Sequence, residues 1–331
     1  RYMNTQAALS PGVLQLDAAA EIARIAEMIR VQTLTTLRRK GVVVAISGGI
    51  DSSVVAAISA LALGPERVLG LLLPEADSSP DSTRLGRALA ESLGIRTCIE
   101  DISPVLEAAG CYRRRDAAIR KLLPEYGEGW KCKIVLPNLL EGKQYSLFSV
   151  VVRSPDGRTL KARLDAEAYF AIVAATSFKQ RTRKMMEYYY ADLMNYAVAG
   201  TPNRLEYDQG FFVKNGDGAA DLKPIAHLYK TQVYQLAEHL RIPEEIVKRP
   251  PTTDTYPLDQ SQEEFYFAVP YQAMDLCLFG KNNGVPAEHV APAANLTVEQ
   301  VERVYGLIDS KRAAARYLHA PPLMLEPQAA A

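Results

Sequence analysis

The residues from Ser47 to Ser53 bring together the kinds of groups that hold a phosphate. The stretch reads Ser-Gly-Gly-Ile-Asp-Ser-Ser and follows an apolar segment. Where a strand turns into a helix, glycines let the backbone approach a ligand, free N–H groups point outward and hydroxyls add donors. A turn whose serines only cap a helix is the alternative. Because the whole run follows a strand, we predict a phosphate or pyrophosphate site at Ser47, Gly48, Gly49, Ser52 and Ser53.

Asp51 lies inside this run, where a carboxylate repels a bound phosphate unless a cation lies between them. Mg²⁺ is the cation that phosphate and carboxylate oxygens hold together. One carboxylate rarely holds it, so we expect a second acidic ligand from another strand end. No GxxxxGK[ST] or GxGxxG follows the first strand, which argues against a Walker-type nucleotidase and a nicotinamide dehydrogenase.

The elements around this run predict an α/β fold. Apolar strands centred near residues 44, 70 and 98 alternate with segments of helical periodicity, beginning with a helix over 16–39. Such alternation forms successive right-handed βαβ units, hence a doubly wound parallel sheet with helices on both faces. Ligands of these sheets bind beyond the carboxyl ends of the strands, which is where the serine and glycine run lies.

Residues 111–177 differ from this pattern. A basic helix precedes two alternating segments, 145–153 and 159–164, around the turn Ser154-Pro155-Asp156-Gly157, which predicts an inserted β-hairpin. Further helices are expected over 178–195, 230–240, 262–279 and 297–316, the last opened by a capping box of Thr297 and Gln300. We therefore expect one domain over 1–331, with 111–177 as an atypical insertion and 256–331 as a helical C-terminal extension.

The composition excludes several classes of function. The chain has 331 residues, 48% of them hydrophobic, and 38 Lys and Arg balance 38 Asp and Glu, so no overall charge attracts nucleic acid or an anionic membrane. The four cysteines form no CxxC motif, which favours free thiols in a reducing cytoplasm. The longest apolar run is far shorter than the ~20 residues of a membrane helix. We expect a cytoplasmic enzyme.

Several motifs together identify a family. Ser-Gly-Gly-x-Asp-Ser is the loop signature of the N-type ATP pyrophosphatases, and the later motifs resemble those of the NAD synthetases of the ammonia-dependent type. The later motifs, in the order of the family, are Lys179-Gln180-Arg181-Thr182-Arg183, Gly200-Thr201-Pro202-Asn203-Arg204-Leu205-Glu206, the segment from Gly210 to Asp221, Tyr229-Lys230-Thr231 and Arg249-Pro250-Pro251-Thr252. The combination is far more specific than any one motif.

The resemblance implies a site as well as a fold of the adenine nucleotide α-hydrolase type. Asp51 and Glu206 would hold Mg²⁺, the loop from Ser47 to Ser53 the pyrophosphate, and Lys230 and Thr252 would contact phosphates. Arg181 and Thr201 would lie in the ATP pocket. Lys214, Asp217 and Asp221 would bind the second substrate, with Asp217 or Asp221 as a candidate general base beside Asp51 and Lys230 in catalysis.

The resemblance also implies the reaction. The nicotinate carboxylate of deamido-NAD attacks the α-phosphorus of ATP, which gives an adenylate and pyrophosphate, and ammonia then displaces AMP. Such a displacement at phosphorus needs positioning and charge neutralisation rather than a nucleophilic side chain. About 40 residues precede the first strand, too few for a glutamine-hydrolysing domain, so free ammonia is the expected nitrogen donor. A homodimer with the dinucleotide site at its interface is implied too.

Other interpretations remain open from the sequence. The basic residues from Lys179 to Lys184 could be a solvated helix face, and Asn215-Gly216-Asp217-Gly218 alone is a strong turn signal. Another ATP pyrophosphatase that amidates a different small carboxylate fits the activation motifs equally well. A tRNA modifier fits less well, because it needs a basic surface. A nucleotide-binding regulatory module is the third possibility, although a mere sensor has little need of Asp51, Glu206 and Lys230.

Overall fold

A four-stranded parallel sheet forms the main body of the protein. The computed structural model describes residues 9–136, 148–252, 255–262, 266 and 269–325. The strand order is β3-β2-β1-β7, and the strands are β1 (Val42–Ala45), β2 (Val68–Leu72), β3 (Arg96–Ile99) and β7 (Ala197–Val198). In β1, Val43 lies opposite both Leu69 and Val198. The predicted parallel sheet is confirmed, and its continuous apolar strands are those of a sheet buried on both faces.

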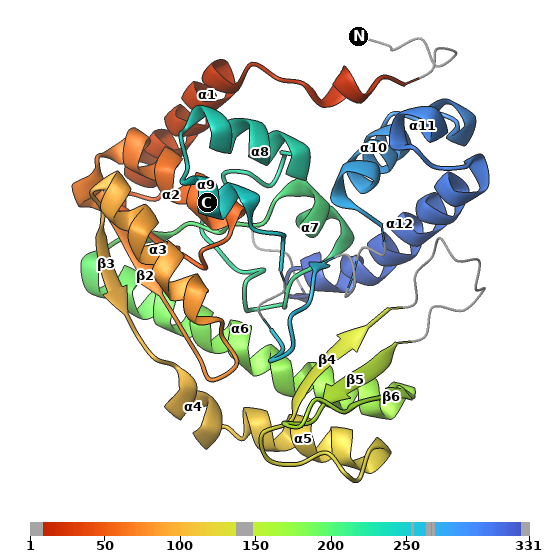
Figure 1. Cartoon of the computed structure of the whole chain (residues 1–331). Helices are drawn as coiled ribbons and strands as arrows, with labels where there is room; N and C mark the ends of the chain where they lie inside the picture. Colours follow the sequence, from red (N-terminus) through yellow and green to blue (C-terminus); the bar gives the residue numbers. More distant parts are fainter. Residues whose placement is uncertain (1–8, 137–147, 253–254, 263–265, 267–268, 326–331) are drawn as a thin grey trace.

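Helices cover both faces of this sheet, as predicted (Figure 1). On one face lie α1 (Ala18–Arg30), α2 (Ile50–Leu63), α3 (Pro80–Leu93) and α8 (Lys230–His239), and on the other α4 (Ser103–Ala108), α5 (Cys111–Leu122) and α6 (Ala166–Met194). The helix expected over 16–39 is α1 continued by a π-helical segment, Val31–Thr36. Short 3-10 turns occupy Pro11–Leu14 and Pro65–Arg67.

A second, antiparallel sheet lies beside α5 and the first half of α6 (Figure 1). The predicted hairpin is present as β5 (Ser149–Arg153) and β6 (Thr159–Arg163), although positions 145–147 of the expected segment lie outside the described residues. The hairpin is not alone, since β4 (Lys131–Val135) adds a third strand. Cys132 and Ile134 of β4 are buried between exposed or half-buried neighbours, a short alternation that the sequence prediction missed.

Helix α6 is longer than predicted. It begins at Ala166 rather than near residue 178, because the side chain of Asp165 accepts the Ala168 N–H and caps the helix. Its first half packs on the antiparallel sheet through Ile172, and its second half packs on the parallel sheet through Ala191. The helix therefore connects the two sheets.

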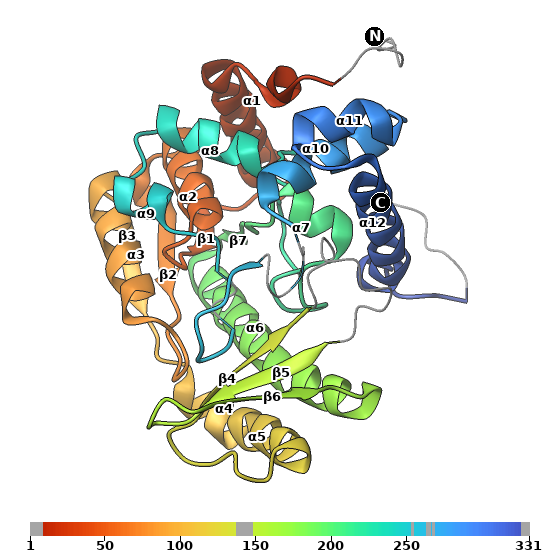
Figure 2. The same ribbon diagram turned by 45° about the vertical axis from the view of Figure 1, so that its right-hand side comes forward.

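A group of helices near the C-terminus packs around a core of its own (Figure 2). It contains α10 (Tyr271–Asn282), α11 (Ala287–Ala294) and α12 (Val298–His319), and α7 (Arg204–Gln209) packs against them. The short helix α9 (Glu244–Lys248) follows α8 and packs instead with the core beside the parallel sheet. The capping box of Thr297 and Gln300 is present. The helix expected over 262–279 begins at Tyr271 after Pro270, and positions 263–265, 267 and 268 lie outside the described residues.

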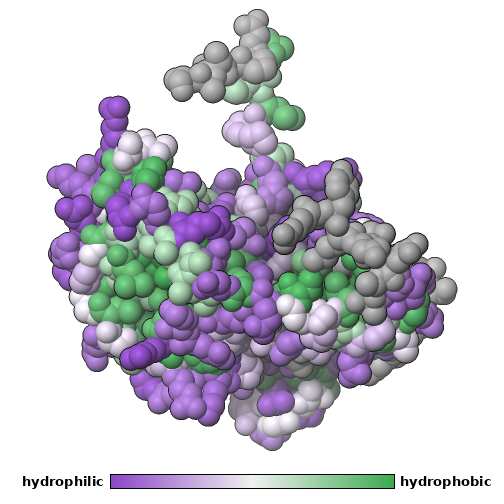
Figure 3. All heavy atoms as spheres, turned by 90° about the horizontal axis from the view of Figure 1, so that it is seen from above, coloured by the Kyte–Doolittle hydropathy of each residue, from purple (hydrophilic) through white to green (hydrophobic). Residues whose placement is uncertain are grey.

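The surface is mixed in character. On the face seen from above, hydrophobic residues form groups among hydrophilic ones (Figure 3). Across the described part of the chain, no helix has both the length and the apolar composition needed to cross a bilayer.

Candidate active site

One large cavity lies where the strands of the parallel sheet end. Its volume is about 780 Å³, within the range of small-molecule sites. The residues that follow β1, β2 and β7 line it, namely Ser47, Leu73 and Ala199. The cavity therefore lies beyond the carboxyl ends of the strands, the ligand position of doubly wound sheets.

The serine and glycine run forms one wall of this cavity. Gly48 has φ +73°, and a Cβ at that position would lie 2.6 Å from the Ser82 carbonyl oxygen of α3, so the close approach requires glycine. Helix α2 begins at Ile50, directly after Gly49, and no side chain caps it. Its first N–H groups and its positive dipole end are available to an anion. Ser47, Gly49 and Ser52 line the cavity, whereas the buried Ser53 hydroxyl donates to the Gly49 carbonyl.

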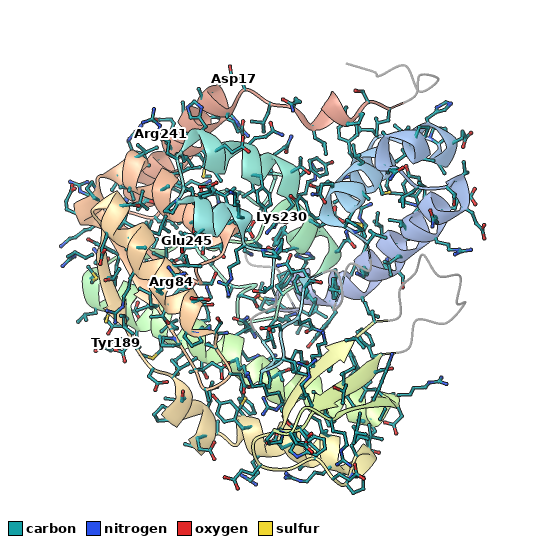
Figure 4. The ribbon with its side chains drawn as sticks, viewed as in Figure 1. Asp17, Arg84, Tyr189, Lys230, Arg241 and Glu245 are labelled. Carbon is teal, nitrogen blue, oxygen red and sulfur yellow. The ribbon has the colours of Figure 1, made fainter. Side chains whose placement is uncertain are left out.

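Asp51 and Lys230 form an ion pair within the cavity wall. Lys230 opens α8, and its buried ammonium group contacts Asp51 Oδ2, while Asn203 Nδ2 donates to Asp51 Oδ1 at 2.9 Å. Burial alone would lower the pKa of Lys230, but the charges of Asp51 and Glu206 outweigh it and raise that pKa. Lys230 therefore stays charged at neutral pH. Figure 4 places it in the interior of the molecule.

Glu206 is the second carboxylate of this group. It lies in the first turn of α7, where a capping box holds it: Glu206 N–H donates to Asn203 Oδ1, and Asn203 N–H donates to Glu206 Oε2 at 3.2 Å. Gln262 Nε2 donates to Glu206 Oε1 at 3.0 Å. Burial and the charge of Asp51 raise the pKa of Glu206 to about 7. A cation bound nearby would stabilise the ionised form of this carboxylate.

The donor set suits a magnesium ion shared with a ligand. The described residues include no cluster of three or more His, Cys, Asp or Glu side chains able to enclose a metal. Asp51 and Glu206 line the same cavity beside an anion-binding helix end. Mg²⁺ is commonly held by one or two carboxylates plus substrate phosphates and water, so two carboxylates and no complete protein cage fit that ion.

The loop from Gly210 to Asp221 supplies the opposite wall. Asp217 is half-buried, lines the cavity and accepts the Val213 N–H at 2.7 Å, and desolvation of its carboxyl group raises its pKa. Lys214 also lines the cavity, but its ammonium group donates to the carbonyls of Tyr317 and Ala320 at the end of α12. Loop and C-terminal helix are thus tied together.

Asp221 lies apart from this group. It lines a second, smaller cavity, together with Arg24, Lys223 and His227. Its carboxylate accepts the Val198 N–H at 2.7 Å and the Tyr188 hydroxyl at 3.2 Å. The structure therefore places Asp221 in a different cavity from Asp217, although both were expected to bind the second substrate.

The remaining residues of the predicted motifs also divide into those that line the main cavity and those that do not. Arg181, Thr201 and Thr252 line the main cavity. Lys179 does not, because it is buried against Glu75 and Asp77. The interpretation of the run from Lys179 to Lys184 as a solvated face is wrong for its two lysines, both of which are buried.

Sequence reasoning missed several side chains of the site. Arg249 lines the cavity and donates to Ser82 Oγ at 3.1 Å; it stood in a quoted motif without a role. Gln262 and Glu187 carried no motif signal at all, because their place depends on elements far away in the chain. An aromatic wall was missed too, formed by Tyr169, Phe170, Phe211, Phe212, Tyr256 and Tyr266.

Comparison with known proteins gives consistent results. The NAD synthase family model matches residues 21–121 and 151–315. The NH3-dependent NAD+ synthetase of Rhizobium meliloti is 59% identical over 318 residues, covering 96% of this chain and 95% of the relative. That of Thermotoga neapolitana is 38% identical, covering 72% and 77%. The NMN synthetase structure from Francisella tularensis has a TM-score of 0.65 at 22% identity, covering 94% and 99%, and shows a common fold.

Proposed function

The chain belongs to the NAD synthase family, and we propose that its main cavity carries out both half-reactions of NH3-dependent NAD+ synthesis. The activity is that of a C–N ligase. In the first half-reaction, deamido-NAD is adenylated by ATP with release of pyrophosphate; in the second, ammonia displaces AMP. The observation that carries the proposal is the meeting of Asp51, Glu206 and Lys230 beside the uncapped end of α2 in one cavity.

The serine and glycine wall binds the β- and γ-phosphates. The N–H groups at the start of α2 and the Ser47 and Ser52 hydroxyls donate to the phosphate oxygens. Lys230 and Arg249 bring positive charge to the same place, and Thr252 adds a hydroxyl. Arg181 and Thr201 line the part of the cavity that receives the rest of ATP. These groups neutralise the leaving pyrophosphate, which is the main requirement of phosphoryl-type displacement.

Asp51 and Glu206 are the residues that would hold Mg²⁺. When bound, the ion would neutralise charge on the triphosphate and orient it. Before binding, Lys230 balances Asp51, and Glu206 is near its own pKa at neutral pH. Asn203 and Gln262 fix the two carboxylates by donating to them, so little reorganisation is needed when the ion arrives.

Asp217 is the general base of the second half-reaction. It lines the main cavity, and desolvation raises its pKa above the ordinary value of an aspartate, which makes the carboxylate a stronger base. Asp221 supports β7 from the neighbouring cavity by accepting the Val198 N–H. Lys214 acts at the substrate end of the cavity, as the sequence motif suggests, while its ammonium group holds the end of α12.

The 111–177 region and the helices after residue 256 complete the cavity of a single domain. Tyr169, Phe170 and Val173, which follow the antiparallel sheet on α6, line it. From the other side come Ala314, Tyr317 and Leu318 of α12. We assign the aromatic wall to the flat rings of the two nucleotide substrates, because offset stacking stabilises such contacts.

Two copies of the chain associate through α6. Met185, Tyr189 and Leu193 are four residues apart, which places them on one face of the helix, and they are 53%, 55% and 66% exposed. Tyr189 points outward at the edge of the molecule (Figure 4). A stripe of large apolar side chains at the surface is typical of an interface. Tyr189→Arg is expected to turn a dimer into a monomer in sedimentation equilibrium; wild-type chain that sediments as a monomer would contradict the assignment.

The decisive experiment follows both products of the reaction. Purified chain with Mg-ATP and ammonium is assayed for pyrophosphate, AMP and NAD+, with and without deamido-NAD. We expect pyrophosphate release that requires deamido-NAD and equals NAD+ formation. Asp51→Asn is the test variant and Asp81→Asn, an exposed acidic residue of α3, is the matched control. Equal pyrophosphate release with and without deamido-NAD would mean that water rather than deamido-NAD attacks ATP and would contradict the proposal, and equal activity of Asp51→Asn would refute the metal assignment.

A further inference from the structure

A second charged pair lies in the cavity wall, away from the phosphate end. Lys184 and Glu187 are one turn apart on α6, and Lys184 Nζ lies 2.6 Å from Glu187 Oε2. Their side chains are only 7% and 6% exposed, yet both line the cavity. Burying two charges costs several kcal/mol of desolvation each, and apolar residues of similar size often serve stability as well. The pair therefore calls for a reason other than packing.

Asp217, in the loop from Gly210 to Asp221, is a charged residue that lines the same cavity as this pair. The loop lies directly on α6, since a Cβ on Gly216 would be 2.9 Å from the Cβ of Gln180. One residue later, Asp217 faces the same cavity. The positive charge of Lys184 lowers the pKa of both Glu187 and Asp217 against the effect of burial, and the charge of Asp217 raises the pKa of Glu187. Lys184 is thus a cation that acts on two carboxylates, that of the buried Glu187 and that of the half-buried Asp217.

The other charges around the group complete this picture. Arg183 on α6 lowers the pKa of both carboxylates, and its Nε donates to the Leu73 carbonyl at 3.4 Å. Lys223 follows the loop, and burial together with the charge of Lys184 lowers its pKa. Among the described residues, Lys184 has one side-chain partner, Glu187. Its remaining N–H donors are therefore available on the cavity side.

We propose that Lys184 and Glu187 are positioning residues for the amidation step, Glu187 holding the Lys184 ammonium group on the cavity side of α6, where its positive charge favours the carboxylate form of Asp217. This inference rests on the proposed function, because it assigns Asp217 the role of base. Neither residue of the pair is required for the transfer of AMP to the substrate, which takes place at the phosphate end.

The pair matters because of the proton balance of the second half-reaction. An ammonium ion gives one proton to Asp217, and the freed lone pair on nitrogen forms the C–N bond with the acyl carbon. The C–O bond to AMP then breaks, its electron pair goes to the phosphate oxygen, and a second proton leaves nitrogen for solvent. A protonated Asp217 cannot start this sequence. The positive charge beside it extends the pH range in which it is a base.

The test compares the two half-reactions in variants of the full chain. In Lys184→Met we expect the acidic limb of the pH profile of kcat/KM for ammonium to move up by roughly one unit, which lowers kcat/KM by up to about tenfold on that limb and little above it. Pyrophosphate release with deamido-NAD in the absence of ammonium should be unchanged. Lys184→Arg, which keeps the charge, should recover the wild-type profile. Each variant is compared with wild type at the same pH, so the titration of ammonium itself cancels.

A double variant keeps the test informative if Lys184→Met folds poorly. Lys184→Met/Glu187→Leu removes both charges at similar volume, so it should unfold at or above the wild-type temperature. Its acidic limb should lie between those of wild type and Lys184→Met, because one raising and one lowering influence on Asp217 are removed together. An unshifted profile in Lys184→Met, or equal losses in both half-reactions, would overturn the inference. Wild-type chain without deamido-NAD-dependent pyrophosphate release would instead contradict the proposed function, and the inference with it.

Discussion

Lys179 and Lys230 are the two largest fully buried side chains of the described residues, and they do different work. Lys179 uses its three N–H donors inside the protein: on Glu75 Oε1 at 3.0 Å, Asp77 Oδ2 at 2.6 Å and the Thr255 carbonyl at 2.7 Å. Lys230 lines the cavity, and within the described part of the chain its side chain bonds only to Asp51. Two donors are left for a ligand.

The surroundings of the two lysines differ in the same sense. Around Lys179, Arg115 adds a second cation on Asp77, and the Tyr112 hydroxyl donates to Glu75 at 2.7 Å. Burial opposes ionisation of Asp77, but Lys179 and Arg115 outweigh it and lower its pKa. Around Lys230, the pKa of Glu206 is raised instead. A charge network satisfied internally joins α5 and α6 to the loop after β2, whereas an incompletely satisfied one marks a binding site.

The largest expected effect is on stability, at the satisfied lysine. Lys179→Met leaves Glu75 and Asp77 buried beside a single remaining cation, so the free energy of unfolding should fall by about 3–5 kcal/mol. Denaturant titration measures this loss. At temperatures where the variant is folded, KM for ATP should stay within about twofold of wild type, since Lys179 does not line the cavity. A large change in KM with unchanged stability would erase the distinction between the two lysines.

Lys230→Met should mainly lower turnover, with a smaller loss of stability. Loss of a charge aimed at the leaving pyrophosphate is expected to lower kcat roughly 10²–10³-fold. Stability should fall less than in Lys179→Met, because Asp51 is 16% exposed and keeps its bond from Asn203. Steady-state kinetics and a denaturant titration on the same preparation give both numbers. Retained turnover in this variant would remove Lys230 from the mechanism.

Glu206 offers a pH-dependent test of the same contrast. Its folded-state pKa of about 7 exceeds the ordinary 4.5, so the folded chain keeps a proton that the unfolded chain loses between those pH values. The free energy of unfolding therefore falls as pH rises through this window. Glu206→Gln removes that decline, so between pH 5 and 8 its stability relative to wild type should improve by about 1–3 kcal/mol without Mg²⁺. A difference that is constant with pH would show that Glu206 is not destabilised in the free protein.

The smallest effect is expected at an exposed pair. Arg84 on α3 and Glu245 on α9 form an ion pair at 2.7 Å (Figure 4), but their side chains are 56% and 66% exposed. Such pairs contribute little because water and salt screen them. Glu245→Ala should change the free energy of unfolding by less than about 0.5 kcal/mol and leave turnover unchanged. A loss above 1 kcal/mol would mean that solvent exposure does not explain why the ion pairs of Lys179, Lys230 and Arg84 differ in their contribution to stability.

The parts of the fold that follow from local pattern could be predicted from the sequence. The turn from Ser47 to Ser53 into α2, the first three strands and the capping box at Thr297 depend on neighbouring residues alone. The early start of α6 depends on a cap at Asp165, which lies inside the region 111–177 that we interpreted as an insertion. The strand β4 is five residues long and is stabilised chiefly by pairing with β5. Pairing of that kind has no local signature.

The residues of the site also divide into those that sequence motifs predict and those whose place depends on tertiary packing. Family motifs supplied Asp51, Glu206, Lys230 and Asp217, all of which line the main cavity. They also assigned Asp221 to the second substrate together with Asp217, and only the path of the backbone reveals that Asp221 lines a separate cavity. The burial of Lys179 depends on Glu75 and Asp77, about a hundred positions away. Sequence spacing cannot predict partners so distant in the chain, because tertiary packing determines which carboxylates lie beside Lys179.

The tie between Lys214 and the end of α12 has an evolutionary consequence. The Lys214 ammonium group holds the carbonyls of Tyr317 and Ala320, and it lies 4.3 Å from the centre of the Tyr317 ring. Lys214 lies three positions before Asp217 in the chain, so the last turn of α12 is physically coupled to the proposed base. Insertions, deletions or fused tags near residue 320 are therefore expected to change the activity of the proposed active site. Among relatives, position 214 and positions 317–320 should be inherited as a unit and change together.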